Sequence, residues 1–223
     1  MCLFFDRKVY LFSVTNSMGK HAKSIDSQIL QRVKAGRGHT VFTARDFLTL
    51  GSRAAVDDAL SRQSRSGAIR KLARGFYYFP HRDDQLGLLS PSVEAITKAL
   101  QTRDAVRLQP SGAYAANLLG LSDQVPMRVV FLTDGAPRRI QVGKLQIVLK
   151  RTTPRNMATA GRVSGLVIQA LRHLGQRHAD DGTLATLRDR LTVADKQQLI
   201  KDLRYAPAWI VRFMQRAAQV EEK

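Results

Sequence analysis

Residues 43–66 read Thr-Ala-Arg-Asp-Phe-Leu-Thr-Leu-Gly-Ser-Arg-Ala-Ala-Val-Asp-Asp-Ala-Leu-Ser-Arg-Gln-Ser-Arg-Ser, and this stretch decides the fold of the first part of the chain. Thr43 is suited to cap a short helix that ends at Leu50. The residues of that helix available for burial are Phe47, Leu48 and Leu50. Gly51 then breaks the chain, and Ser52 is suited to begin a longer helix. A short helix, a tight glycine-containing turn and a longer helix form the helix-turn-helix pattern.

The longer helix, expected over residues 53–66, has two different faces. At 100° per residue, one face is assigned to the core and holds Val56, Ala59, Leu60 and Gln63. The opposite face holds Ala54, Asp57, Asp58, Ser61, Arg62 and Arg65. Small, polar and basic groups of this kind suit the major groove of DNA. We expect Asp57 to pair with Arg53 and Asp58 with Arg62, or the two acids to accept a hydrogen bond from a cytosine amine.

The flanking residues complete a compact unit. Ser24–Ala35 is predicted as a helix with Ile25, Ile29, Leu30 and Val33 on one face, ended by Gly36-Arg37-Gly38 and followed by the short extended piece Thr40–Phe42. Downstream, Ala68–Ala73 and Phe76–Phe79 resemble strands joined by Arg74-Gly75, which predicts a hairpin. Ile69, Leu72 and alternate aromatic residues are expected to pack beneath it. A hairpin directly after such a helix is a wing, so residues 24–80 predict a winged helix-turn-helix.

Charge is concentrated in the same segment. The chain has 36 lysines and arginines against 18 aspartates and glutamates, a net charge of +18. Residues 20–82 hold 13 basic and 4 acidic residues, a net charge of +9, whereas residues 83–223 reach +8 over more than twice the length. Such an excess opposes compaction and favours a polyanionic partner. We expect double-stranded DNA, ahead of an acidic protein or an anionic membrane surface.

The expected DNA contacts lie on the two helices and the wing. They are Arg45, Ser52, Arg53, Ala54, Ser61, Arg62, Arg65, Arg70, Lys71 and Arg74. A unit of this shape can instead serve protein contacts alone, with its cations merely solvated. If DNA is bound, the operator is expected to be an inverted repeat read by two copies, although two monomers on adjacent sites fit equally well.

The polar, turn-rich stretch His81–Gly87 marks the expected boundary, so residues 20–82 form the first domain and residues 83–223 the second. In the second domain, helices are predicted over 92–100, 161–174, 183–191, 194–203 and 208–218, and strands over 127–133, 138–142 and 145–150. Residues 109–121 read as a loop that enters a helix of small residues. The fold class is therefore α+β, a winged helix-turn-helix followed by a small antiparallel sheet and a helical bundle.

The second domain also has basic residues that flank its strands. They are Arg107, Arg138, Arg139, Lys150, Arg151 and Arg155. One interpretation is a docking face for DNA or an acidic partner. The other is a solvated sheet edge that its charges protect from aggregation.

Groups able to support catalysis are few. His173, His178, Asp180 and Asp181 match no trusted metal-ligand spacing, so we expect solvated side chains. Asp134 is not followed by the Glu-x-Lys pattern of a metal-dependent nuclease, and the chain lacks a glycine-rich phosphate loop and the G-x-S-x-G and H-E-x-x-H motifs. We therefore expect no enzyme activity, no metal and no cofactor. A nucleic-acid-cutting enzyme that depends on Asp134 or His178 is the remaining alternative.

The rest of the chain indicates a cytoplasmic protein. Cys2 is the only cysteine, and no apolar run approaches the roughly 20 residues that cross a bilayer. Asp6, Arg7 and Lys8 interrupt the apolar opening stretch, unlike a secretory signal. Residues 1–19 are expected to be a disordered extension, with Met18 as a plausible start.

Three phrases of this sequence resemble the AbiEi-like antitoxins of type IV toxin–antitoxin systems, a group that includes the DUF6088 family. They are Leu50-Gly-Ser-Arg-Ala-Ala-Val-Asp-Asp-Ala-Leu60, Leu72-Ala-Arg-Gly-Phe-Tyr-Tyr78 and Pro110-Ser-Gly-Ala-Tyr-Ala-Ala-Asn-Leu-Leu-Gly-Leu121. Gln124-Val-Pro126 and Leu132-Thr-Asp-Gly135 follow the last and more specific phrase. The resemblance covers about residues 24 to 218.

The resemblance implies a DNA-binding antitoxin that represses its own operon through the winged helix. Its second domain is then expected to oppose a nucleotidyltransferase-like toxin encoded nearby, without a stable complex. Ser52, Arg53, Arg62 and Arg65 map to the recognition helix, and Arg70, Lys71 and Arg74 to the wing. The alternative is a stand-alone winged-helix regulator whose second domain dimerises or senses a ligand.

Overall fold

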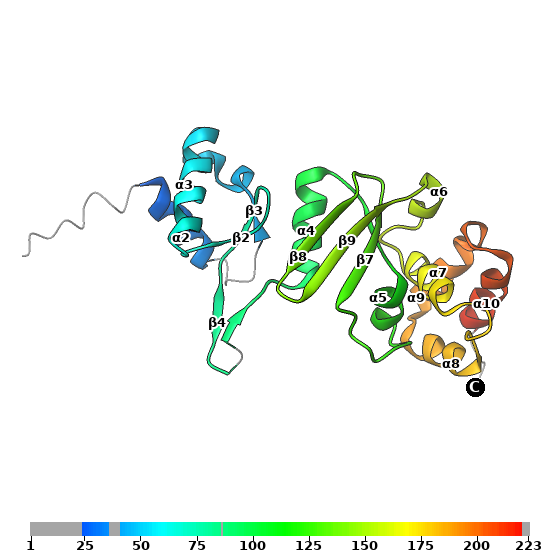
Figure 1. Ribbon diagram of the computed structural model, residues 1–223. Coiled ribbons are helices and arrows are strands. Elements are labelled where there is room, and N and C mark those ends of the chain that lie inside the picture. The colour runs from blue at the N-terminus through cyan, green and yellow to red at the C-terminus, as the bar shows by residue number, and fades with distance from the viewer. Residues whose placement is uncertain (1–23, 36–40, 86, 220–223) are drawn as a thin grey trace, which may run out of the picture.

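A computed structural model of the chain describes residues 24–35, 41–85 and 87–219. The predicted extension at residues 1–19 and the predicted glycine turn at residues 36–38 lie outside these ranges. An N-terminal unit of helices and short strands is followed by a sheet and then by a group of helices (Figure 1). None of the helices within the described ranges is long and apolar enough to cross a membrane.

The N-terminal unit has the order expected of a winged helix-turn-helix. Its elements are α2 (Ile25–Ala35), β1 (Val41–Phe42), η1 (Ala44–Leu50), α3 (Arg53–Arg65), β2 (Arg70–Ala73) and β3 (Phe76–Tyr78). The three strands form an antiparallel sheet in the order β1-β3-β2. Ser52 begins α3 by accepting a hydrogen bond from the backbone N–H of Ala55, and Gly67 follows the helix with a φ of 79°.

The burial of α3 follows the predicted faces. Its buried residues are Val56, Ala59, Leu60 and Gln63. In η1 the expectation is wrong for Leu48, whose side chain is 45% exposed. This element is a 3₁₀ helix with three residues per turn, so Ala44, Phe47 and Leu50 share the inner face and Leu48 turns outward. Asp46 holds its start by accepting the Thr43 backbone N–H at 2.6 Å.

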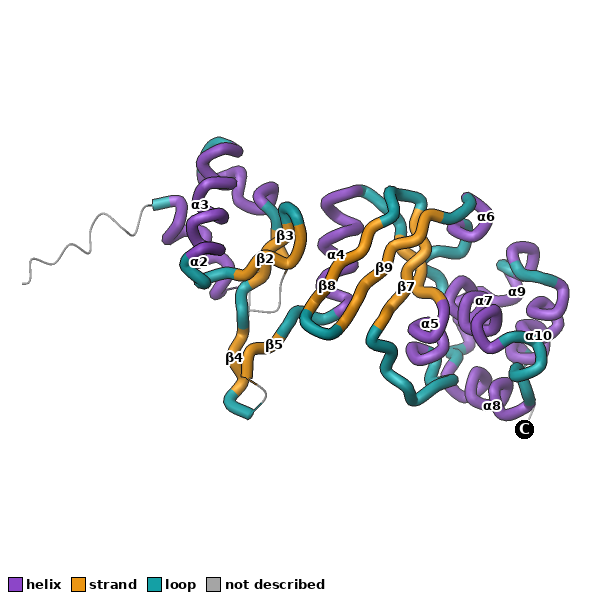
Figure 2. Tube along the Cα trace, viewed as in Figure 1, coloured by secondary structure: helices purple, strands orange, loops and turns teal. Residues whose placement is uncertain are grey.

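Two short strands, β4 (His81–Asp83) and β5 (Gly87–Leu89), pair antiparallel where the sequence predicts a turn-rich boundary. The strands project from the N-terminal unit, and the chain runs from β5 to the second unit (Figure 2). The division of the chain after residue 82 stays a prediction.

The second unit begins with α4 (Val93–Asp104), β6 (Leu108–Ser111), α5 (Gly112–Leu118), β7 (Arg128–Thr133), β8 (Arg138–Val142) and β9 (Leu145–Arg151). The predicted α+β class is confirmed, and its sheet has the strand order β6-β7-β9-β8. Two of the three pairings are antiparallel, whereas β7 and β9 run parallel because β9 returns between β7 and β8. The prediction of a loop from residue 109 is wrong for residues 109–111, which belong to β6; Pro110 fits there because β6 is an edge strand.

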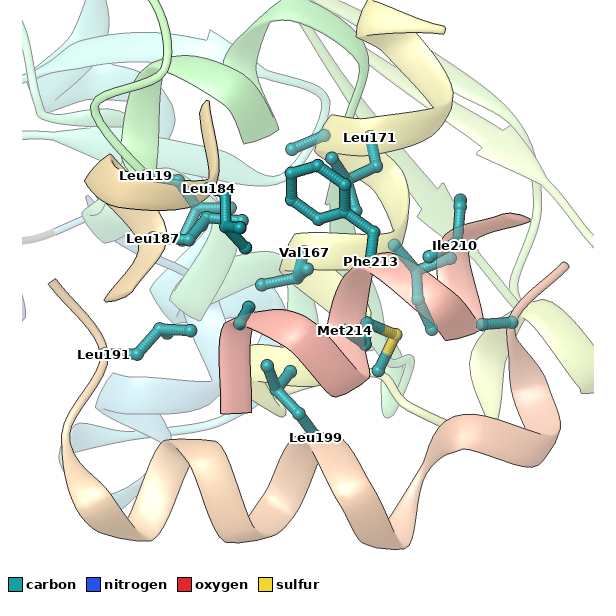
Figure 3. Packing of buried hydrophobic residues seen from close by; sticks show 14 of the residues in the cluster. Leu119, Val167, Leu171, Leu184, Leu187, Leu191, Leu199, Ile210, Phe213 and Met214 are labelled. Carbon is teal, nitrogen blue, oxygen red and sulfur yellow. The ribbon is translucent and has the colours of Figure 1, made fainter. Parts of the chain in front are cut away.

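The chain ends in α6 (Pro154–Met157), α7 (Val163–Leu174), α8 (Asp181–Arg190), α9 (Val193–Lys201), η2 (Leu203–Tyr205) and α10 (Ala208–Ala218). Leucine, valine and phenylalanine side chains from α7, α8, α9 and α10 meet in one apolar core (Figure 3). Ser164 at the start of α7 and Arg162 just before it both donate to the buried Asp202 carboxylate after α9, at 2.5 and 2.9 Å. These bonds fix α7 to the end of α9.

The N-terminal unit and the sheet share a hydrophobic core. Side chains alternate along β3, so Tyr77 and Phe79 face the core formed with α2 and α3, while Phe76 and Tyr78 face the second unit. Phe76 is 1% exposed and packs in one cluster with Ile96 and Leu100 of α4. Leu72 packs there too. Ile69 packs on the helix side of the hairpin, whereas Leu72, predicted to pack beneath the hairpin with it, packs on the side of the second unit, because both faces of this small sheet are covered.

Phe76→Ala tests this shared core. Truncating a fully buried phenylalanine costs about 3–5 kcal/mol of unfolding free energy, and we expect one cooperative loss that involves both units. Urea unfolding followed by the fluorescence of Trp209, the only tryptophan, and by far-UV circular dichroism measures it. Leu48→Ala, at a half-exposed position, should change stability by less than about 0.5 kcal/mol. A loss below about 1 kcal/mol for Phe76→Ala, or separate transitions for the two probes, contradicts the expectation.

Candidate nucleic-acid interface

The exposed face of α3 is open to solvent. Arg53, Ala54, Asp57, Asp58, Ser61, Arg62 and Arg65 are all exposed, as is Ser52 before the helix. The hairpin of β2 and β3 lies between α3 and the second unit (Figure 1). The exposed side chains of this helix are therefore available to a groove-sized partner.

Two ion pairs engage the arginines of α3. Arg53 Nε lies 2.7 Å from Asp57 Oδ2, as predicted. Arg62 binds Asp26 of α2 rather than Asp58, with Nη2–Oδ2 at 2.7 Å and Nε–Oδ1 at 3.3 Å. The predicted Asp58–Arg62 pair is therefore wrong, because a guanidinium fork fits a facing carboxylate in two bonds. The hydrogen bond from Arg62 lowers the pKa of Asp26 below its ordinary value.

The wing is basic and its tip is anchored from the second unit. Arg70, Lys71 and Arg74 are exposed. Gly75 turns the tip with a φ of 76°, and a Cβ added there would lie 2.9 Å from Arg103 Nη1. That same nitrogen donates to the Arg74 carbonyl at 2.9 Å. The guanidinium carbon of Arg103 also stacks 3.9 Å from the centre of the Phe76 ring.

A hollow of about 660 Å³ brings the two predicted basic sets together. We call it the interdomain hollow. It is lined by Thr43, Ala44, Arg45, Arg53, Ala73, Arg74, Gly75, Arg103, Asp104, Arg138 and Arg139. Arg45 donates to the Arg103 carbonyl at 3.1 Å, and Asp104 lies between Arg103 and Arg138 at 2.8 and 3.1 Å. Three expected DNA contacts (Arg45, Arg53 and Arg74) and two expected docking residues (Arg138 and Arg139) thus line the same hollow.

The other expected docking residues divide into two groups. Lys150 and Arg151 join Arg138 and Arg139 along a second hollow of about 440 Å³, the sheet hollow. Arg107 instead binds the Asp134 carboxylate at 2.8 Å, and Arg155 approaches the Arg204 carbonyl at 3.5 Å. Neither lines the two hollows, so the predicted six residues do not form one continuous face.

Sequence reasoning missed Arg103 and Asp26. Arg103 contacts the wing tip across 29 residues, and Asp26 meets Arg62 across 36. No local spacing signals such contacts, because they depend on how α2, α3 and α4 pack. Arg128, which lines the sheet hollow, was also not singled out.

The side chains considered for catalysis have structural contacts. The hydrogen bond from Arg107 lowers the pKa of Asp134, whose carboxylate also accepts the Arg107 backbone N–H at 2.9 Å. Asp180 accepts the Thr183 N–H at the start of α8, and Asp181 pairs with Arg216. Nδ1 of His178 lies 3.0 Å from the Leu174 carbonyl oxygen. Within the described ranges, no three His, Cys, Asp or Glu side chains gather closely enough to hold a metal ion.

Comparison with known proteins gives a family and a likeness to solved structures. A family model described as a family of unknown function, DUF6088, matches residues 28–199. The crystal structure of the RV2827C protein from Mycobacterium tuberculosis aligns with a TM-score of 0.48 and 18% identity. The alignment covers 87% of this chain and 77% of that chain. No curated protein matches the sequence.

Asp26→Asn tests the ion pair that holds Arg62. The folded-state pKa of Asp26 is lowered from 3.8, so its stabilisation is present above that value and is lost as the pH falls through the folded pKa. We expect a small loss of unfolding free energy at neutral pH, because exposed ion pairs contribute little. Urea titrations of both proteins at a series of decreasing pH values measure it. The unfolding free energies of the wild type and Asp26→Asn, plotted against pH, should converge in acid. A difference that stays constant with pH contradicts a stabilising Asp26–Arg62 pair.

Proposed function

The chain belongs to the DUF6088 family, and from that premise we propose that it is a DNA-binding antitoxin. The winged helix binds duplex DNA and represses the protein's own toxin–antitoxin operon. The second domain opposes a cognate nucleotidyltransferase-like toxin encoded nearby. The DNA-binding half rests on the geometry of α3 and the wing, and the antitoxin half rests on the resemblance to AbiEi-like antitoxins.

One observation supports DNA binding above the others: the uncovered face of α3 stands beside a basic wing. Ser61 and Arg65 are exposed on that face, and Arg70, Lys71 and Arg74 are exposed along the hairpin. An exposed helix of this kind enters a major groove, where arginine can bind guanine and small side chains can contact the thymine methyl. The basic side chains of the wing are suited to contact the phosphates that flank the groove. Such phosphate contacts fix the register and orientation of the protein on the duplex.

The acids on α3 fit this proposal once their partners are considered. Asp57 is neutralised by Arg53 at the start of the helix. Asp58 is exposed and forms no ion pair within the described part of the chain, so it remains suited to accept a hydrogen bond from a cytosine amine. Arg62 has to exchange Asp26 for a phosphate or base when DNA binds. The Asp26–Arg62 pair is therefore expected to weaken DNA binding.

A stand-alone regulator is the second candidate function. The core shared by Phe76, Ile96 and Leu100 favours it, because a ligand or a second copy bound by the second domain would act directly on the wing. The two candidates separate on genomic context: a nucleotidyltransferase-like neighbour supports the antitoxin, and its absence supports the stand-alone regulator.

The DNA-binding proposal predicts a steep salt dependence. If about six phosphates are neutralised, log K should fall against log[salt] with a slope of about −5. Arg65→Ala should lower affinity for the DNA upstream of the gene by about 10- to 100-fold and relax sequence preference, whereas Arg74→Ala should weaken upstream and random duplexes alike. Asp26→Asn should tighten binding, because it releases Arg62.

Fluorescence anisotropy with labelled duplexes measures these affinities. Arg177→Ala removes an exposed arginine from the turn before α8 and is the matched control; it should leave the slope unchanged. A slope near zero for the wild type overturns DNA binding. If Arg65→Ala and Arg74→Ala lower the affinity equally, and by the same factor for the upstream and the random duplex, then α3 is not the recognition helix.

The antitoxin proposal predicts rescue of growth. Co-expression of the intact chain with the neighbouring gene product should restore growth that the neighbour alone arrests. Arg65→Ala should retain rescue when both genes have a foreign promoter, because it disables operator reading only. Growth arrest that persists with the intact chain overturns the antitoxin role and leaves the DNA-binding role standing.

A further inference from the structure

The interdomain hollow is built from both units. Arg45 and Arg53 come from η1 and the start of α3, Arg74 comes from the wing tip, and Arg138 and Arg139 come from the start of β8. Cations far apart in the sequence therefore face one space. Its position beside α3 and the wing makes it continuous with the proposed DNA contacts.

The hollow has a large excess of positive charge. Six of its eleven lining residues are arginines, and Asp104 is the only acid among them. Asp104 contacts both Arg103 and Arg138, so one carboxylate serves two guanidinium groups. Like charges held this close repel one another, and the repulsion grows as water is excluded. An anion placed among them relieves that repulsion.

The six arginines differ in what they already bind, and Arg53 is paired with Asp57 of its own helix. Arg103 and Arg138 are structural: both bind Asp104, and Arg103 also stacks on Phe76 and holds the wing carbonyl. Arg74 and Arg139 are exposed, and within the part of the chain that the structure describes their guanidinium groups have neither an ion pair nor a hydrogen bond. Arg45 uses one of its five N–H donors on the Arg103 carbonyl. Free donors therefore remain on both sides of the hollow.

The positive surface continues beyond the hollow. Arg138 and Arg139 also line the sheet hollow, together with Arg128, Lys150 and Arg151. Because the two hollows share Arg138 and Arg139, their basic residues together extend from the start of α3 to the sheet. Basic residues spread over this length match an extended polyanion better than a small anion, because duplex DNA presents about one charge per 1.7 Å of helix axis.

We propose that the interdomain hollow binds the phosphate backbone of the DNA duplex that α3 and the wing contact, with Arg139 as the contact from the second unit. The proposal rests on the proposed DNA-binding function and extends its footprint to both units. Among the described residues that line the hollow, none offers an aromatic ring on which a free nucleotide base could stack. The arginines present can bind the phosphate oxygens of the backbone without contacting a base.

Arg139→Gln in the full-length protein tests the contact. With a random-sequence duplex of about 30 base pairs, three helical turns, the slope of log K against log[salt] should become shallower by about 0.9. Combining it with Arg74→Gln should remove about 1.8 in total. Arg139→Lys, which keeps the charge, should recover most of the slope. Arg177→Gln removes the same charge outside both hollows and should not change it, and equal melting temperatures verify folding.

The outcomes separate this contact from the proposed function. A wild-type slope near zero overturns both. A steep wild-type slope that Arg139→Gln leaves unchanged overturns the interdomain contact alone. Calorimetric titration with inorganic pyrophosphate distinguishes a free phosphate source: binding that Arg139→Gln abolishes, without any change in the DNA slope, assigns the hollow to a small anion and overturns the proposal.

Discussion

The burial of β3 on both faces is the constraint on which the rest of the molecule depends. Tyr77 and Phe79 complete the core of the helix-turn-helix, while Phe76 and Tyr78 enter the core that α4 and the sheet provide. A three-stranded sheet of this size cannot form a stable unit with one apolar face in water, because exposed aromatic area is costly. The second unit is therefore part of the wing's support, and it fixes where the wing tip points.

The packing of the wing against the second unit also determines where the basic side chains near the wing tip lie. Arg103 stacks on Phe76 and binds the Arg74 carbonyl, and Asp104 holds Arg138 close by. An arginine that packs against an aromatic ring and a backbone carbonyl is held in place, and its bond to the Arg74 carbonyl fixes the wing-tip backbone that carries the unpaired Arg74 side chain. Fixing that backbone in advance reduces the entropy lost on binding. The basic surface is thus organised by a hydrophobic contact.

Sequence reasoning succeeded where local periodicity sets the structure. The four inward residues of α3, the hairpin, the helix over residues 208–218 and the α+β class all follow from spacing and caps. It failed where packing between distant elements decides: the 3₁₀ geometry that turns Leu48 outward, the parallel β7–β9 pairing, and the choice of Asp26 as partner of Arg62. The interdomain hollow could not be predicted for the same reason, since its walls come from separate segments spread between Thr43 and Arg139.

The core shared by the two units also limits which experiments can assign a function to one unit alone. A chain cut after residue 82 would expose Val41, Phe76 and Tyr78, which now pack against α4 and the sheet. Any loss of DNA binding by such a fragment would combine a distorted wing with the missing second unit. Surface substitutions avoid this ambiguity, because Arg65, Arg74 and Arg139 are exposed and lie outside all three apolar clusters. Function must therefore be assigned side chain by side chain in the intact protein, where the fold holds both halves of the basic surface together.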